Sequence, residues 1–205
     1  MKKAIAGMLA LLLGACSLGP AQKDTPATYD LGAAPPGASA KLPRIRASLL
    51  VQGVAAPGWL ETQAIIYRLD YQDAARQQVY AHSRWAAPPA ALLAQRLRSQ
   101  LAAASDGGIL GIADSARADY ALRVELEEFS QTFDAVDASR AVIVARASIV
   151  NVTRRALLAQ KTFAIEKPAA TPNAEGGVRA LAAASGELIE AIVAWTAASL
   201  AQDSK

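Results

Sequence analysis

The chain has 205 residues, of which 53% are hydrophobic and 19% are charged, and this composition supports one globular core with its end segments. It excludes a chain that is disordered throughout. The formal charge of +3 includes Lys2 and Lys3 of the N-terminal segment, and without them 19 basic side chains face 18 acidic ones. We therefore expect no nucleic-acid partner. One His and one Cys exclude zinc sites with several Cys or His ligands and an internal disulfide, so we expect neither metal nor cofactor.

The N-terminus has the features of a signal peptide, which we place at residues 1–15. Its apolar run, Ala4–Leu13, is too short to cross a bilayer as a helix, since that needs roughly 20 apolar residues. The run ends in Leu13-Gly14-Ala15-Cys16, which resembles a bacterial lipobox, so we expect Cys16 to become an acylated, palmitate-bearing N-terminus. The alternative is an ordinary secretory signal with a chance Cys. By resemblance to proteobacterial lipoproteins, Ser17 favours the outer membrane, with the protein facing the periplasm.

Residues 16–44 are predicted to be a lipidated tether, because half of the ten prolines of the chain fall there. Within it, Tyr29-Asp30-Leu31 could form a short edge strand. The folded domain is expected at 45–205. Its apolar patterns predict strands at Arg46–Val54, Thr62–Leu69, Gln78–Trp85, Tyr120–Phe129, Ala141–Val152 and Ala156–Ile165. Turns are expected at Asp70–Asp73 and Thr153–Arg155.

Two amphipathic helices are predicted. The first, Pro89–Ala104, begins with a proline that suits a first helical turn and carries a leucine stripe every four residues. The second, from about Ala174 to Leu200, has Asn173 as a candidate N-cap. The order of strands, helix, strands and helix predicts an α+β fold in which two helices pack on a largely antiparallel sheet.

A series of short motifs follows the lipobox: Tyr29-Asp30-Leu31, Val54-Ala55-Ala56-Pro57-Gly58-Trp59-Leu60-Glu61-Thr62, Ile66-Tyr67-Arg68, Val79-Tyr80, Ser83-Arg84-Trp85-Ala86 and Pro88-Pro89 before the stretch Ala90–Leu101. The series resembles the ABC-type transport auxiliary lipoprotein family of the paraquat-inducible protein C type. The resemblance implies a periplasm-facing lipoprotein beside an ABC transporter and a protein with MCE domains, in systems that move phospholipids or other lipids between two membranes. The competing hypothesis is a free-standing lipoprotein that binds a small hydrophobic ligand.

The sequence has no motif of a known active site. His82 is the single imidazole, and a Ser-His-Asp arrangement in space stays open, although no Gly-x-Ser-x-Gly turn or phosphate loop is present. Glu125, Glu127 and Glu128 could act as acids and bases, or they could line a solvated strand face beside Arg123. We prefer the structural interpretation for each and expect no enzyme activity.

Four residues are candidates for partner contact: Trp59, Leu60, Arg68 and Trp85. Trp59 follows Pro57-Gly58 in a predicted loop, where it either packs in the core or forms a contact surface. Trp85 could equally pack under the first helix, and Arg68, which faces away from Tyr67, could pair with a carboxylate. The partners we expect are the MCE-domain protein, the ABC transporter components and the membrane itself, with phospholipid and a homo-oligomer left open.

Overall fold

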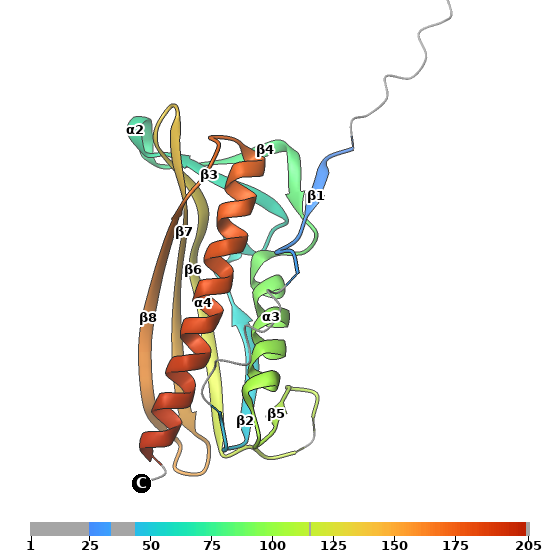
Figure 1. Ribbon diagram of the computed structural model, residues 1–205, viewed down its shortest axis with the longest axis vertical. Coiled ribbons are helices and arrows are strands. Elements are labelled where there is room, and N and C mark those ends of the chain that lie inside the picture. The colour runs from blue at the N-terminus through green and yellow to red at the C-terminus, as the bar shows by residue number, and fades with distance from the viewer. Residues whose placement is uncertain (1–24, 34–43, 115, 204–205) are drawn as a thin grey trace, which may run out of the picture.

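The computed structural model describes residues 25–33, 44–114 and 116–203, which form a mixed sheet with two long helices on one face (Figure 1). The strands are β1 (Ala27–Tyr29), β2 (Leu49–Ala55), β3 (Ala64–Leu69), β4 (Ala74–Trp85), β5 (Ile109–Leu110), β6 (Tyr120–Ala135), β7 (Ala138–Asn151) and β8 (Ala156–Pro168). The helices are α2 (Asp70–Asp73), α3 (Pro89–Ala104) and α4 (Ala174–Asp203), with a 3-10 turn, η3, at Gly58–Leu60. The α+β class is confirmed.

Strand β6 is the central strand of the sheet, because it pairs with β2, β3 and β7. On one edge it pairs with β7 from Tyr120 to Ala135. Its other edge is shared, because β2 runs parallel to its first part, with Leu49 opposite Tyr120, and β3 runs parallel to its last part, with Tyr67 opposite Gln131. β2 and β3 therefore lie end to end along β6, and η3 occupies the gap between them.

The prediction of a largely antiparallel sheet is wrong. Four pairings are parallel (β1–β4, β2–β5, β2–β6 and β3–β6), and three are antiparallel (β3–β4, β6–β7 and β7–β8). Consecutive strands suggested hairpins, but the chain crosses over through α3 and adds β6 parallel to both β2 and β3. A third helix, the single turn α2, also stands where only a turn was predicted.

Helices α3 and α4 pack on the sheet through the predicted apolar stripes. In α3, Leu93, Leu97 and Leu101 are at most 2% exposed. The α4 N-cap is also confirmed, because the Asn173 carboxamide oxygen accepts from the Gly176 N–H at 2.9 Å. Among the described residues, α4 alone is long and apolar enough to cross a membrane, yet 56% of its apolar window is buried inside the domain. It is a core helix, packed on β7 and β8.

Part of the predicted tether belongs to the fold. The expected edge strand is present as β1, which pairs parallel with β4, with Tyr29 opposite Trp85. Leu31 follows it and is only 6% exposed. The packed domain therefore includes residues before the predicted boundary at residue 45.

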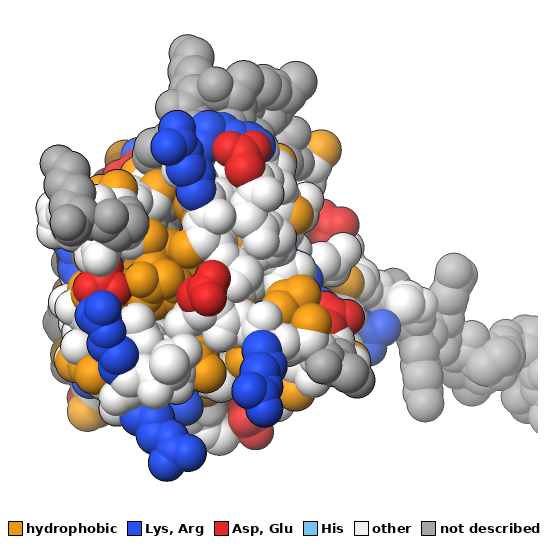
Figure 2. Space-filling model, turned by 90° about the horizontal axis from the view of Figure 1, so that it is seen from below, with side chains coloured by type: hydrophobic (Ala, Val, Ile, Leu, Met, Phe, Trp, Pro, Cys, Tyr) orange, Lys and Arg blue, Asp and Glu red, His pale blue; other side chains and the backbone are white. Residues whose placement is uncertain are grey.

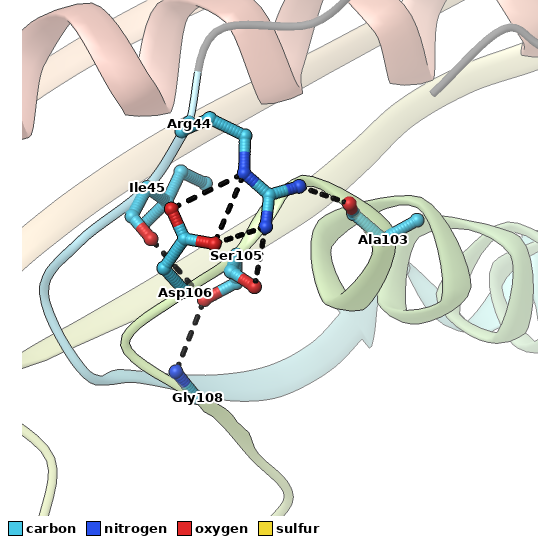
Figure 3. Close-up of polar contacts among 6 residues, drawn as sticks. All are labelled: Arg44, Ile45, Ala103, Ser105, Asp106 and Gly108. Carbon is cyan, nitrogen blue, oxygen red and sulfur yellow. Dashed lines mark hydrogen bonds and ion pairs between the residues drawn. The ribbon is translucent and has the colours of Figure 1, made fainter. Parts of the chain in front are cut away.

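Arg44 fixes the point at which the chain enters β2 (Figure 3). Its Nε lies 3.2 Å from each carboxylate oxygen of Asp106, and its other nitrogens donate to the carbonyls of Ala103 at 2.6 Å and Ser105 at 3.2 Å. A guanidinium suits the C-terminal end of α3, where carbonyls lack helical partners. The hydrogen bond from Arg44 also lowers the pKa of Asp106. This contact joins the N-terminal segment to the end of α3.

Candidate functional site

Trp59 projects from the gap between β2 and β3. In the turn η3, the Leu60 N–H donates to the Pro57 carbonyl at 2.8 Å, and the Glu61 N–H donates to the Gly58 carbonyl at 3.2 Å. A tight turn points successive side chains in different directions. Leu60 is therefore fully buried, at 0% exposed, while Trp59 is 37% exposed. Leu60 anchors the turn in the core, and the turn holds the indole at the surface.

Arg68 of β3 lies against Trp59. Its guanidinium carbon is 5.8 Å from the centre of the indole ring, which is a cation–π distance. The same guanidinium lies 3.2 Å from Glu128 Oε2 on β6 and donates to the Ala74 carbonyl at 3.3 Å. The ion pair is largely shielded, with the Arg68 and Glu128 side chains 18% and 22% exposed. Arg68 is thus fixed between two elements, and it limits the movement of the indole.

Trp59 and Arg68 lie on the sheet face that α3 and α4 leave uncovered. Arg68 is opposite Thr132, whereas the neighbouring Gln131 points to the helix face, against Gly177 of α4. The same open face carries Val79, which is 56% exposed, and the half-buried Val142 and Val144. We name these residues the Trp59 surface: Trp59, Arg68, Val79, Val142 and Val144. It is a partly apolar area with one cation at its centre.

Two polar atoms beneath this surface have no hydrogen-bond partner among the described residues. They are Glu128 Oε1 and Ser130 Oγ, and both are buried. Across the β6–β7 ladder, Glu128 is opposite Val144 and Ser130 is opposite Val142. Buried polar groups are normally paired, and each unpaired one costs about 1–3 kcal/mol. Two polar oxygens therefore lie buried beneath the valines of the Trp59 surface.

The remaining carboxylates of the open face are paired with cations. Arg146 of β7 pairs with both Glu125 and Glu127 of β6, and its hydrogen bond with Glu125 raises the arginine pKa. The arrangement agrees with the solvated polar face that the sequence suggested for these two residues. His82 is exposed on β4, and within the described ranges no three His, Cys, Asp or Glu side chains are grouped as metal ligands.

The structure separates the four residues predicted for partner contact. Trp59 and Arg68 meet on the open face. Leu60 and Trp85 do not belong to it, because both are core residues, at 0% and 1% exposed. Trp85 packs edge-on against Phe129, with ring centres 5.6 Å apart, which is the core role that the sequence left open for it. Partner contact by Leu60 or Trp85 is therefore incompatible with the folded domain, while that of Trp59 and Arg68 stays a prediction.

Sequence reasoning missed Val142 and Val144 as members of the surface. A signal for them was available in the unbroken apolar run from Ala141 to Ala145. A strand with one solvated face should alternate, so such a run indicates that both faces are at least partly covered or used. Cys16, the predicted lipidation site, lies outside the described residues.

The sequence matches the family described as the ABC-type transport auxiliary lipoprotein component over residues 29–193. The chain belongs to this family. The resemblance proposed from the sequence is confirmed, and membership implies a lipoprotein of the cell envelope that assists an ABC-type transport system. No curated protein matches the chain.

Solved structures show the same fold. A crystal structure of protein XCC0632 from Xanthomonas campestris, of family DUF330, is 20% identical with a TM-score of 0.70, covering 88% of this chain and 95% of that one. A crystal structure of an uncharacterized protein is 19% identical with a TM-score of 0.60, covering 84% of this chain and 98% of that one. At this level of identity the likeness concerns the fold alone.

Proposed function

We propose that this protein is a non-enzymatic accessory lipoprotein of an MCE-type, ABC-driven lipid transport system. Acylated Cys16 anchors it in the outer membrane, and the folded domain docks on the MCE-domain partner in the periplasm. Family membership supports the transport role. The observation that carries the docking role is Trp59, an exposed indole that η3 and Arg68 hold in one orientation.

The Trp59 surface suits a protein contact for two reasons. Tryptophan and arginine are enriched among residues that dominate binding energies, and here they are adjacent. Both are also fixed before a partner arrives, Arg68 by Glu128 and the indole by the turn, so little conformational entropy is lost on binding. The surrounding valines and exposed sheet face supply the apolar area that such a pair needs around it.

The chain length between the anchor and the fold limits where the domain can work. Ten residues separate Cys16 from Ala27, the first residue of β1. At about 3.5 Å per residue they span at most roughly 40 Å. The sequence alone suggested a tether through residue 44, and the docked strand β1 shortens that reach. The domain therefore works near its membrane, and a partner must extend to it.

Affinity capture tests this proposal. A C-terminally tagged full-length chain is purified from detergent-solubilised envelopes, and the captured proteins are identified by mass spectrometry. The proposal predicts co-capture of an MCE-domain protein with its permease and ATPase, and recovery of the tagged chain in the outer-membrane fraction of a density gradient. Capture without any MCE-domain protein, as a free-standing ligand-binding lipoprotein would give, contradicts the docking role. Recovery in the inner membrane contradicts the location.

A further inference from the structure

The last turns of α4 and the start of β2 lie at the domain end farthest from β1 (Figure 1), and a largely apolar recess lies between them. It has a volume of about 730 Å³ and lies between the last turns of α4 and the segment that enters β2. Ile45 and Leu200 line its floor, and small side chains, Ala197 and Ala201, line its wall on α4. Figure 2 shows hydrophobic side chains on both sides of an acidic side chain near the middle of this end, with Lys and Arg side chains farther out. Both size and lining are typical of sites for small amphiphilic ligands.

Among the described residues that line the recess, one cation makes no ion pair. Arg44 and Arg46 both line the recess, but the Arg44 guanidinium is held by Asp106 and by two carbonyls of the α3 end (Figure 3). Arg46 is exposed and makes no ion pair within the described ranges. On the opposite wall, Asp203 accepts a hydrogen bond from the Tyr120 hydroxyl at 2.7 Å and pairs with Arg154. Among the described residues that line the recess, Arg46 is therefore the cation without an ion-pair partner, although it lies close enough to Asp106 to lower the pKa of that carboxyl.

The recess offers little backbone for strand addition by an extended peptide. Its wall at residues 44–47 precedes β2, Ile45 is bridged there to Ser105, and β2 itself is paired with β5 and with β6. The α4 wall is helical and offers mainly methyl groups. What the described part of the recess provides is apolar depth below the guanidinium of Arg46, which complements an acyl chain that carries an anionic group.

We propose that this recess holds one acyl chain of an anionic phospholipid, with the phosphate beside Arg46. The site shares no residue with the Trp59 surface, so the proposal of a lipid site does not depend on the docking role of Trp59. It opens at the end of the domain opposite to β1, through which the anchor is connected (Figure 1). A lipid bound there would be presented away from the anchor.

Photo-crosslinking in living cells tests the site on the full-length protein. A photoreactive phenylalanine replaces Ala201 at the recess, and as a matched control it replaces Ala183, another exposed alanine on α4. The two are eighteen positions apart in the sequence, which is five helical turns, so they share one helix face about 27 Å apart. Cells are labelled with ³²P-phosphate, which enters phospholipids but not the acyl anchor. After irradiation, ³²P on the purified protein reports bound phospholipid.

We expect ³²P adducts at position 201 and none above background at position 183. Arg46→Glu should lower the adduct at position 201 about tenfold, because a charge-assisted contact is lost. Arg117→Glu, a charge reversal at another exposed arginine, should leave it unchanged. Thermal melting of both variants controls for folding. Equal labelling at 201 and 183, no labelling at 201, or an adduct whose mass shows a free fatty acid without phosphate would each overturn the proposal.

Discussion

Replacing Gly176 by alanine should destabilise the domain, although alanine normally favours a helix. Gly176 lies in the first turn of α4, and a Cβ atom there would sit 2.1 Å from the backbone carbonyl oxygen of Thr171. That separation is too short for a carbon and an oxygen, so the loop before α4 must move. The same loop carries Asn173, whose side chain caps the helix through the Gly176 N–H.

The magnitude follows from three contributions. Overpacking costs about 1–3 kcal/mol, and a disturbed N-cap costs about 1 kcal/mol. The helix propensity of alanine returns at most about 1 kcal/mol. The free energy of unfolding should therefore fall by about 1–3 kcal/mol. At roughly 2–4 °C per kcal/mol for a domain of this size, the melting temperature should fall by about 2–12 °C.

Gly186 of the same helix is the matched control. A Cβ atom added there has nothing within 4 Å, so Gly186→Ala should raise stability by about 0.4–1 kcal/mol. Circular dichroism melts of the two single variants and the parent chain measure both effects. The packing argument is refuted if Gly176→Ala is as stable as the parent, or if both substitutions shift the melting temperature in the same direction.

Three further predictions concern the lipid anchor, the pKa of Tyr80 and the Trp59 surface. Cys16→Ala should abolish metabolic labelling with palmitate, and unchanged labelling would refute the lipobox assignment. Burial, and then the neighbouring Tyr67, raise the pKa of Tyr80 to about 12. Since the unfolded phenol ionises near pH 10, the stability that Tyr80 contributes should be constant below pH 10 and decline between about pH 10 and 12. Urea melts of Tyr80→Phe should show a smaller decline than the parent, because Tyr120, whose pKa is also raised, remains. Arg68→Met should lower the free energy of unfolding by about 1–3 kcal/mol, because it leaves Glu128 unpaired. Adding Glu128→Gln should restore most of that loss. If the double-mutant cycle shows no coupling energy between the two positions, the ion pair does not contribute to stability.

Local features of the fold could be predicted because local chemistry determines them. The proline predicted the start of α3, the leucine spacing predicted its buried face, and Asp106-Gly107-Gly108 predicted its end, all as observed. Asn173 was identified as a cap from its side chain and position alone. Strand pairing could not be predicted in this way. Periodicity shows which residues form β2, β3 and β6, but the parallel insertion of β6 depends on contacts between residues about 70 positions apart.

The candidate site was predictable only in part. The Pro57-Gly58 turn placed Trp59 in a loop but left open whether the indole packs in the core, and the same reasoning placed Leu60 beside it as a contact residue. Adjacent residues of a 3-10 turn point in different directions, and only the three-dimensional structure shows which one enters the core. The recess at the end of α4 was not foreseen, because Arg44 and Ile45 stand at the predicted boundary between tether and domain and meet Leu200 only after folding.

The central claim is that Trp59 binds a partner rather than stabilising the core, and one variant tests it. Trp59→Ala should raise the dissociation constant for the MCE-domain partner about 30-fold or more, which corresponds to about 2 kcal/mol. Its unfolding free energy should fall by less than the roughly 3–5 kcal/mol lost with a core tryptophan, because the indole is 37% exposed. Tyr71→Ala, an exposed aromatic on α2 at 41%, should bind like the parent. Both quantities are measured on the same purified proteins, by biolayer interferometry and by chemical denaturation. Unchanged affinity, or a loss of 3–5 kcal/mol in stability as expected for a core tryptophan, would contradict the account.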